Sequence, residues 1–408
     1  MGMIRGIGLL AAYAVGAVFV TACWTEYAGT ETFDNRYSSI VAISDGTAPI
    51  PFVRRRLVFD VARAVVKLVP DAAWRAVEGS PPVKDLARRF DWPEADLPIL
   101  LTTTALIALS VFGFMLVARA TVARLYRTPP WLPGLAGLVL GLMLMLMGGG
   151  GDRHYQWYPY DFPNAFVTSL TLAGFLAGSP WAYLSFAAAC YSKETAFTLI
   201  LARWLLLQDR RAWRAYVPLA VMAAFFVLVQ FRLRMLYHSV DGEGFWMFKR
   251  NMGMLAKFVL FQSWVLIAWG VCLVRIGKAW GQFPRQLRRL SAIPLLLVSA
   301  GVFKGWLEEH RQYAECLLIF GPMLLQWALI ELGLGRWMEP RDAGPVDRES
   351  SRGMEPGADG REIRVDQDSS SPVASEPAGA TESRGSHHHR PLADHAAVGP
   401  ESTDRHFA

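Results

Sequence analysis

Ten apolar runs divide this chain, and most of them are long enough for a helix that crosses a lipid bilayer. Backbone groups inside lipid must be paired within a helix or a closed barrel, and these runs lack the alternating pattern of barrel strands. Since a spanning helix needs about 20 mostly apolar residues, the sequence predicts an all-α, polytopic transmembrane helical bundle of about 9–11 helices. The runs fall near residues 4–23, 97–118, 131–147, 162–178, 180–192, 195–207, 214–231, 254–275, 291–307 and 315–334.

Two neighbouring runs, 180–192 and 195–207, are short for full spans. Proline removes a backbone donor and disfavours a continuous helix. We therefore expect Pro180 to separate two helices, and a partly re-entrant region is the alternative to two full spans.

Basic residues sort onto alternate connections between the runs. With the N-terminus in the cytoplasm, the arginine- and lysine-rich connections 119–127, 208–214, 275–290 and 336 onward all lie on the cytoplasmic side, as the positive-inside rule requires. The arginines at 54–56 and the basic residues of segment 232–250 are exceptions, because they fall on the opposite side. A local structural reason is needed to explain basic residues there. The basic excess is thus a topology signal, and no nucleic-acid partner is predicted.

The last part of the chain differs in composition from the rest. Residues 340–408 hold 13 acidic and 8 basic residues and many Ser, Pro and Gly residues, whereas the remainder carries a net charge of about +11. We predict a transmembrane domain over residues 1–338 and a disordered cytoplasmic tail over 339–408. The first extracytoplasmic loop, 24–96, is predicted to carry an amphipathic helix over 56–77, with an apolar face near Leu57, Val61, Val65, Leu68 and Val69. This helix either lies flat on the membrane surface or belongs to a small exposed domain.

Polar and charged residues gather in four clusters that share the predicted outer face. The clusters lie at 31–37 with 51–57, at 152–164, at 192–195 and at 308–315. Each has an ordinary structural explanation, such as a solvated loop, an interfacial aromatic belt or a surface ion pair. Lys193 and Glu194 could likewise pair with each other or cap the next helix.

Taken together, the clusters favour a polar cavity. Lys193 and Glu194 sit between two apolar runs, where charges are expensive and are usually paired or line a cavity. Arginine and lysine can hold phosphate oxygens, and tyrosine and tryptophan can stack on a sugar. A carboxylate can remove a proton from an acceptor hydroxyl. Such a cavity suits an anionic substrate that bears a sugar.

In the arrangement of these clusters, the chain resembles the C-type (GT-C) superfamily of membrane glycosyltransferases. Within that superfamily it resembles a group of bacterial multi-pass proteins of unassigned activity. Asp34 and the 56–77 helix occupy the places of that family's acidic residue and surface helix in the first outer loop. Four short motifs carry the rest of the resemblance. They are Pro51-Phe52 with Arg55 and Leu57, Tyr160-Asp161 with Pro163, Ser192-Lys193-Glu194-Thr195, and Glu309 with Arg311, Tyr313 and Glu315.

The resemblance implies a polyprenyl-phosphate-sugar-dependent glycosyltransferase at the outer face of a bacterial inner membrane. Its partners would be the polyprenyl-phosphate sugar donor, a glycan or lipid acceptor, and membrane lipid. Asp34 would be the catalytic base, with Asp161 as a second catalytic carboxylate. The substrate-binding residues would be Arg55, Tyr160, Lys193, Glu194, Glu309, Arg311 and Tyr313.

Two other functions remain open. The first is a transporter or lipid flippase, whose charges would line a path near the bilayer midplane. The second is a non-catalytic membrane component of envelope-polysaccharide assembly. Soluble-enzyme classes are excluded because the chain has no Walker loop, dinucleotide glycine pattern, nucleophile elbow or HExxH motif. No cofactor is predicted. The four cysteines have neither metal-ligand spacing nor a disulfide framework.

Overall fold

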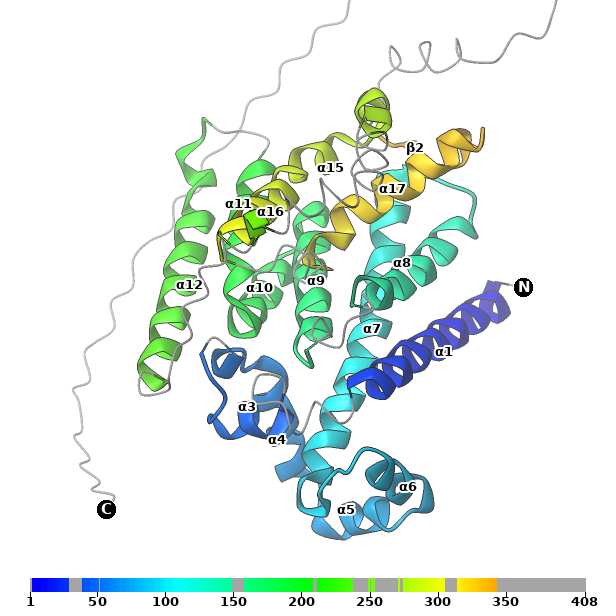
Figure 1. The fold of residues 1–408 in the computed structure, drawn as a ribbon. Helices are drawn as coiled ribbons and strands as arrows, with labels where there is room; N and C mark the ends of the chain where they lie inside the picture. The colour runs from blue at the N-terminus through cyan, green and yellow to red at the C-terminus, as the bar shows by residue number, and fades with distance from the viewer. Residues whose placement is uncertain are drawn as a thin grey trace, which may run out of the picture. The chain divides into compact units, whose positions relative to one another are not determined.

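In the computed structural model, the described residues are 2–28, 39–50, 52–148, 158–207, 211–237, 249, 251–253, 271, 274–304 and 314–342. Within them the chain is mostly helical, which confirms the all-α prediction (Figure 1). A single pair of two-residue strands occurs in these ranges.

The apolar runs that fall on described residues form helices. These are α1 (Gly2–Ala28), α7 (Leu97–Leu125), α8 (Leu132–Gly148), α9 (Asp161–Ala177), α10 (Trp181–Ser192), α11 (Phe197–Leu205), α12 (Val217–Leu236), α16 (Ala292–Lys304) and α17 (Leu317–Glu331). The run at 254–275 lies almost entirely outside the described residues. Four of the described helical segments are long and apolar enough to cross a membrane, namely Gly6–Ala28, Glu94–Leu125, Trp213–Leu236 and Ala314–Glu331. This length and composition indicate an integral membrane protein.

A tight turn joins α9 to α10, which lie side by side (Figure 1). Gly178 ends α9 with a φ of 67°, in the left-handed region that glycine adopts without strain. Pro180 then precedes the first residue of α10. The expected separation of two helices at Pro180 is thus confirmed. At 12 and 9 residues, α10 and α11 are shorter than full spans.

Small residues let α1, α7 and α8 approach closely, as is common in membrane helix packing. The hydroxyl of Tyr13 in α1 donates to the Gly134 carbonyl of α8 at 2.8 Å. A Cβ atom on Gly137 would meet that Tyr13 hydroxyl and would lie 2.5 Å from the backbone oxygen of Met115 in α7. Gly137 is therefore the position where these three helices leave no space for a side chain.

Substitution of Gly137 by alanine is expected to destabilise the protein by about 1–3 kcal/mol, because the backbone of α7 would have to move. Thermal unfolding in detergent measures the loss. Gly8→Ala is the matched control in α1, since a Cβ atom there has nothing within 4 Å. Equal stability of the two variants would contradict this packing.

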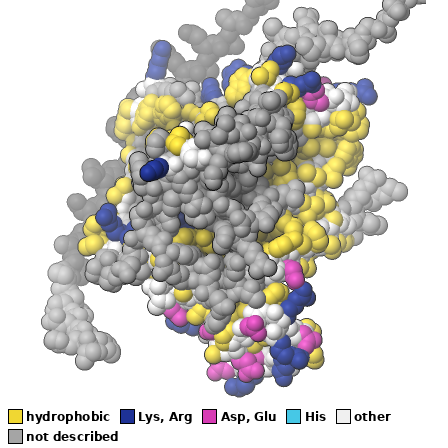
Figure 2. All heavy atoms as spheres, in the orientation of Figure 1, with side chains coloured by type: hydrophobic (Ala, Val, Ile, Leu, Met, Phe, Trp, Pro, Cys, Tyr) yellow, Lys and Arg dark blue, Asp and Glu magenta, His cyan; other side chains and the backbone are white. Residues whose placement is uncertain are grey.

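The first long connection forms a group of short helices. They are α3 (Ile40–Asp45), η1 (Phe52–Arg54), α4 (Leu57–Leu68), α5 (Asp71–Glu78), α6 (Pro81–Arg89) and η2 (Glu94–Asp96). The single helix expected over 56–77 is wrong, because the chain breaks at Pro70 between α4 and α5. Figure 2 shows acidic and basic side chains gathered over α5 and α6, and apolar side chains over α1 and α8. Charges of this density keep α5 and α6 out of hydrocarbon.

The face that α4 buries also differs from the predicted one. Val58, Phe59 and Ala62 are buried, whereas Val61 and Leu68, which were expected on the apolar face, are exposed. Helix α4 packs against α3, α7 and α10. Tertiary contacts with these helices therefore decide which residues of α4 are buried.

Three segments that the charge pattern assigns to the cytoplasmic side lie together in the structure. Strand β1 (Tyr126–Arg127) pairs antiparallel with β2 (Glu339–Pro340). Four further short helices lie in the connections assigned to this side. They are η5 (Trp213–Ala215), η6 (Trp280–Gln282), α15 (Arg285–Leu290) and η8 (Gly335–Trp337). The Arg285 backbone N–H donates to Asp342 at 2.8 Å. The described residues of this group thus extend to Asp342.

Candidate functional site

Three charged residues stand at helix ends that meet. Asp161 is the first residue of α9, Lys193 follows the last residue of α10, and Glu315 lies just before the start of α17. Carboxylates are favourable at helix N-termini and cations at C-termini because of the helix dipole. The three side chains therefore match the dipoles of the helices that carry them.

Lys193 is the centre of this group. Its Nζ lies 2.9 Å from Glu315 Oε1 and 3.7 Å from Asp161 Oδ1. The side chains of Lys193, Asp161 and Glu315 are 7%, 4% and 3% exposed. Charges this deeply buried require partners, and Lys193 supplies the cation for two carboxylates.

Arg55 forms a second group beside the first. Its Nη2 lies 2.7 Å from Glu194 Oε1, and its Nη1 donates to the Tyr160 hydroxyl at 2.6 Å. The guanidinium also lies over the Tyr160 ring, 4.7 Å from the centroid, a cation–π arrangement. The Arg55 side chain is only 11% exposed, whereas that of Glu194 is 47% exposed. Glu194 is thus the member of the cluster most open to its surroundings.

The backbone at Lys193 explains how the two groups connect. Its φ of −162° and ψ of 150° are extended, so successive side chains point to opposite sides. Lys193 turns toward Asp161 and Glu315, whereas Glu194 turns toward Arg55. The partners of Lys193 and Glu194 therefore lie in distant segments, and the ion pair between these two neighbours that the sequence allowed is not formed.

Neighbouring charges control the protonation of the cluster. Burial alone would lower the pKa of Lys193, but Glu315 and Asp161 outweigh it and raise this pKa above its usual value. Partial burial would raise the pKa of Glu194, but the charge of Arg55 outweighs it and lowers this pKa. Both residues are therefore ionised at neutral pH. We define the ion cluster as Arg55, Asp161, Lys193, Glu194 and Glu315, which holds two cations and three carboxylates.

Arg56 fixes the first connection against the bundle. Its guanidinium donates to the Ile43 and Ser44 carbonyls and to Asp60, and its backbone N–H donates to the Tyr191 carbonyl of α10 at 3.1 Å. These contacts hold α3 and α4 at the end of α10 where the ion cluster lies. The charge pattern assigns Arg55 and Arg56 to the side opposite the other basic connections. Their contacts within the structure are a local reason for arginines at these two positions.

Some hydrogen-bonding capacity in this region is left over. Lys193 Nζ lies 2.9 Å from Glu315 Oε1, whereas Glu315 Oε2 and the Asn164 Nδ2 group, one turn after Asp161 in α9, have no hydrogen-bond partner among the described residues. Buried polar atoms of this kind are uncommon. They are an acceptor and a donor that a polar ligand can satisfy.

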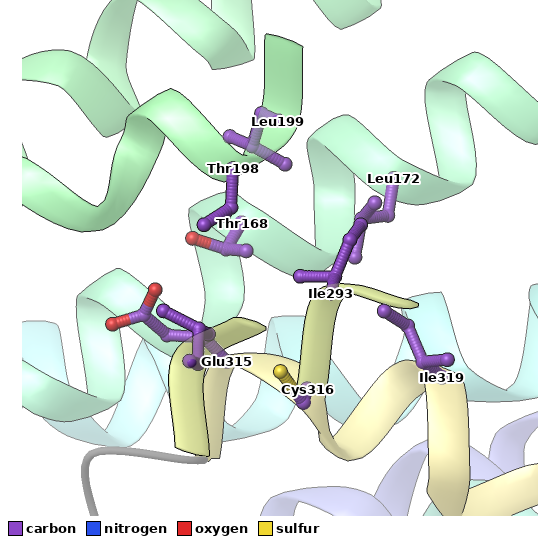
Figure 3. Close-up of a pocket in the computed structure, with 9 residues that line it drawn as sticks. Thr168, Leu172, Thr198, Leu199, Ile293, Glu315, Cys316 and Ile319 are labelled. Carbon is purple, nitrogen blue, oxygen red and sulfur yellow. The ribbon is translucent and has the colours of Figure 1, made fainter. Parts of the chain in front are cut away.

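A narrow pocket lies beside Glu315, and it is too small to hold a water molecule. Figure 3 shows the Glu315 carboxylate pointing away from the apolar side chains of Leu172, Ile293 and Ile319 that line this pocket. Thr168 and Thr198 contribute its polar lining. This pocket is a packing gap, and a polar ligand would have to approach the carboxylate from its other side.

The structure brings together five of the nine predicted site residues, namely Arg55, Tyr160, Asp161, Lys193 and Glu194. Asp34, Glu309, Arg311 and Tyr313 lie outside the described residues. Among the described residues, Ala28, Ser39 and Ala314 are the nearest to them in the chain.

The predicted set of site residues did not include Glu315, which proves to be the nearest carboxylate to Lys193. Its position four residues after Arg311 favoured a helix-surface network. Its position at the start of an apolar run was the signal for a buried carboxylate.

Comparisons of the chain with protein-family models, with curated proteins and with solved structures find no match. The function is therefore inferred from the chemistry of the site and from the motifs in the sequence.

Proposed function

We propose that this protein is a glycosyltransferase of the GT-C type, which transfers a sugar from a polyprenyl phosphate at the outer face of a bacterial inner membrane. The observation that carries the proposal is the ion cluster, in which Lys193 is buried between Asp161 and Glu315 at the meeting point of three helix ends.

The charge of the cluster suits glycosyl transfer. The described cluster has one more carboxylate than cations. Glycosidic bond cleavage passes through an oxocarbenium-like transition state, in which positive charge develops on the sugar. A fixed, buried negative charge stabilises such a state because nearby water is excluded.

The position of the cluster supports transfer over transport. Its members stand at the ends of helices α9, α10 and α17. Transporter sites lie near the bilayer midplane, within broken spanning helices. A charged site at one end of the bundle suits a substrate that is held by its lipid tail at the membrane surface.

The contacts suggest a division of labour among the residues. Lys193 is buried between two carboxylates, so we assign it the role of positioning Asp161 and Glu315 rather than binding phosphate directly. Arg55 can turn toward a donor phosphate because its partner Glu194 is half exposed. Asp34 remains the proposed base and Arg311 the proposed second phosphate ligand, with Glu309 and Tyr313 at the sugar.

A transfer assay tests the proposal. The purified full chain is reconstituted in liposomes with polyprenyl phosphates that carry radiolabelled hexoses or pentoses, and with a membrane glycolipid fraction as acceptor. The expected result is loss of label from one donor, its appearance in the acceptor and release of polyprenyl phosphate. A donor that crosses the bilayer with its glycosidic bond intact would support a flippase. If no donor of the panel is consumed by the folded protein, the proposal fails.

A further inference from the structure

A basic surface lies at the end of the bundle where α15 meets the β1–β2 pair. Segment 274–290 contains five basic residues and no acidic residue. Arg275 pairs with Glu331, and the backbone N–H of Arg285 donates to Asp342. Lys278, Arg288 and Arg289 have no acidic partner among the described residues. This end therefore carries uncompensated positive charge.

Two arginines of neighbouring helices have unused donors there. Arg203 stands in the last turn of α11 and Arg288 in the last turn of α15, and α11 packs against α15. The Nε atom of each is buried and has no hydrogen-bond partner among the described residues. Arg289, the next residue of α15, is exposed. We call Arg203, Arg288 and Arg289 the basic patch.

The basic patch borders an apolar surface. Helix α16 begins two residues after α15 ends, packs against α11 and exposes Leu295, Leu296 and Val298. Trp204, next to Arg203, is also partly exposed. Tryptophan is enriched at the level of lipid head groups. A ligand that covers both surfaces needs an anionic head and apolar chains.

We propose that the basic patch binds the phosphate of an anionic phospholipid, whose acyl chains lie along the exposed side chains of α16. Guanidinium groups form strong, charge-assisted hydrogen bonds with phosphate, and basic residues at the cytoplasmic surface attract anionic lipids. The bound lipid would connect α11 to α15. This site is independent of the proposed transfer reaction.

Native mass spectrometry of the detergent-purified full chain tests the proposal with phosphatidylglycerol and phosphatidylcholine of the same acyl chains. We expect phosphatidylglycerol to bind about tenfold more tightly, and the double variant Arg203→Gln/Arg288→Gln to lose about that factor. Arg289→Gln is the second test, because an exposed side chain can be changed without unfolding the protein. Arg88→Gln, an exposed position in α6, is the control and should bind like the wild type.

Three results would overturn the proposal. Equal binding of the two lipids would show that the head-group charge is not recognised. Unchanged phosphatidylglycerol binding in both the double variant and Arg289→Gln would place the lipid elsewhere. Full displacement of phosphatidylglycerol by inorganic phosphate would show a site for a soluble anion.

Discussion

Substitution of Lys193 by methionine is expected to destabilise the protein by about 3–5 kcal/mol, the usual effect of removing one partner from a buried ion pair. Methionine keeps the length and apolar character of the side chain, so packing changes little. The loss arises because Asp161 and Glu315, at 4% and 3% exposure, are left as buried carboxylates without their cation. Thermal unfolding in detergent measures this effect.

Two further variants separate charge from packing. Arg88→Met removes a cation whose partner Asp85 is also exposed, and an exposed pair contributes only about 0–1 kcal/mol. Adding Glu315→Gln to Lys193→Met removes one of the two stranded charges and should restore part of the stability. If Lys193→Met unfolds no more easily than Arg88→Met, the buried network is not present.

Replacement of Asp34 by asparagine is expected to reduce sugar transfer by about 10²–10⁴-fold, the usual contribution of a general base. Asparagine has the same shape but cannot take the proton of the acceptor hydroxyl. Since only the chemistry is changed, the thermal unfolding temperature should stay that of the wild type. The measurement is the initial rate of label transfer in liposomes.

Asp85→Asn is the matched control, because Asp85 is an exposed carboxylate of the same connection. It should transfer at the wild-type rate. Full activity of Asp34→Asn would exclude this residue as the base and would leave the carboxylates of the ion cluster as the candidates.

The helices could be predicted from the sequence because their causes are local. Apolar runs of the right length form helices, and Gly178 with Pro180 ends one helix and begins the next. The break at Pro70 also has a local cause, because proline disfavours a continuous helix. Which face of α4 is buried could not be predicted, because its neighbours α3, α7 and α10 come from other parts of the chain.

The ion cluster was predictable as a gathering of residues, but its pairing was not. Charges that interrupt apolar runs pointed to Asp161, Lys193 and Glu194. Their partners depend on the extended backbone at Lys193 and on the meeting of three helix ends. Sequence proximity allows an ion pair between Lys193 and Glu194. In the structure Lys193 instead pairs with Glu315, and Glu194 pairs with Arg55.

The orientation of the bundle is the claim on which the proposed outer-face reaction depends most directly. It is tested by single cysteines at Arg88→Cys in α6 and Lys278→Cys in the basic segment, each in a chain whose four cysteines are replaced by alanine. Both positions are exposed. A membrane-impermeant maleimide should label position 88 in intact cells and position 278 only after the inner membrane is permeabilised. Labelling of position 278 in intact cells, with position 88 protected, would place the ion cluster in the cytoplasm and contradict the proposed function.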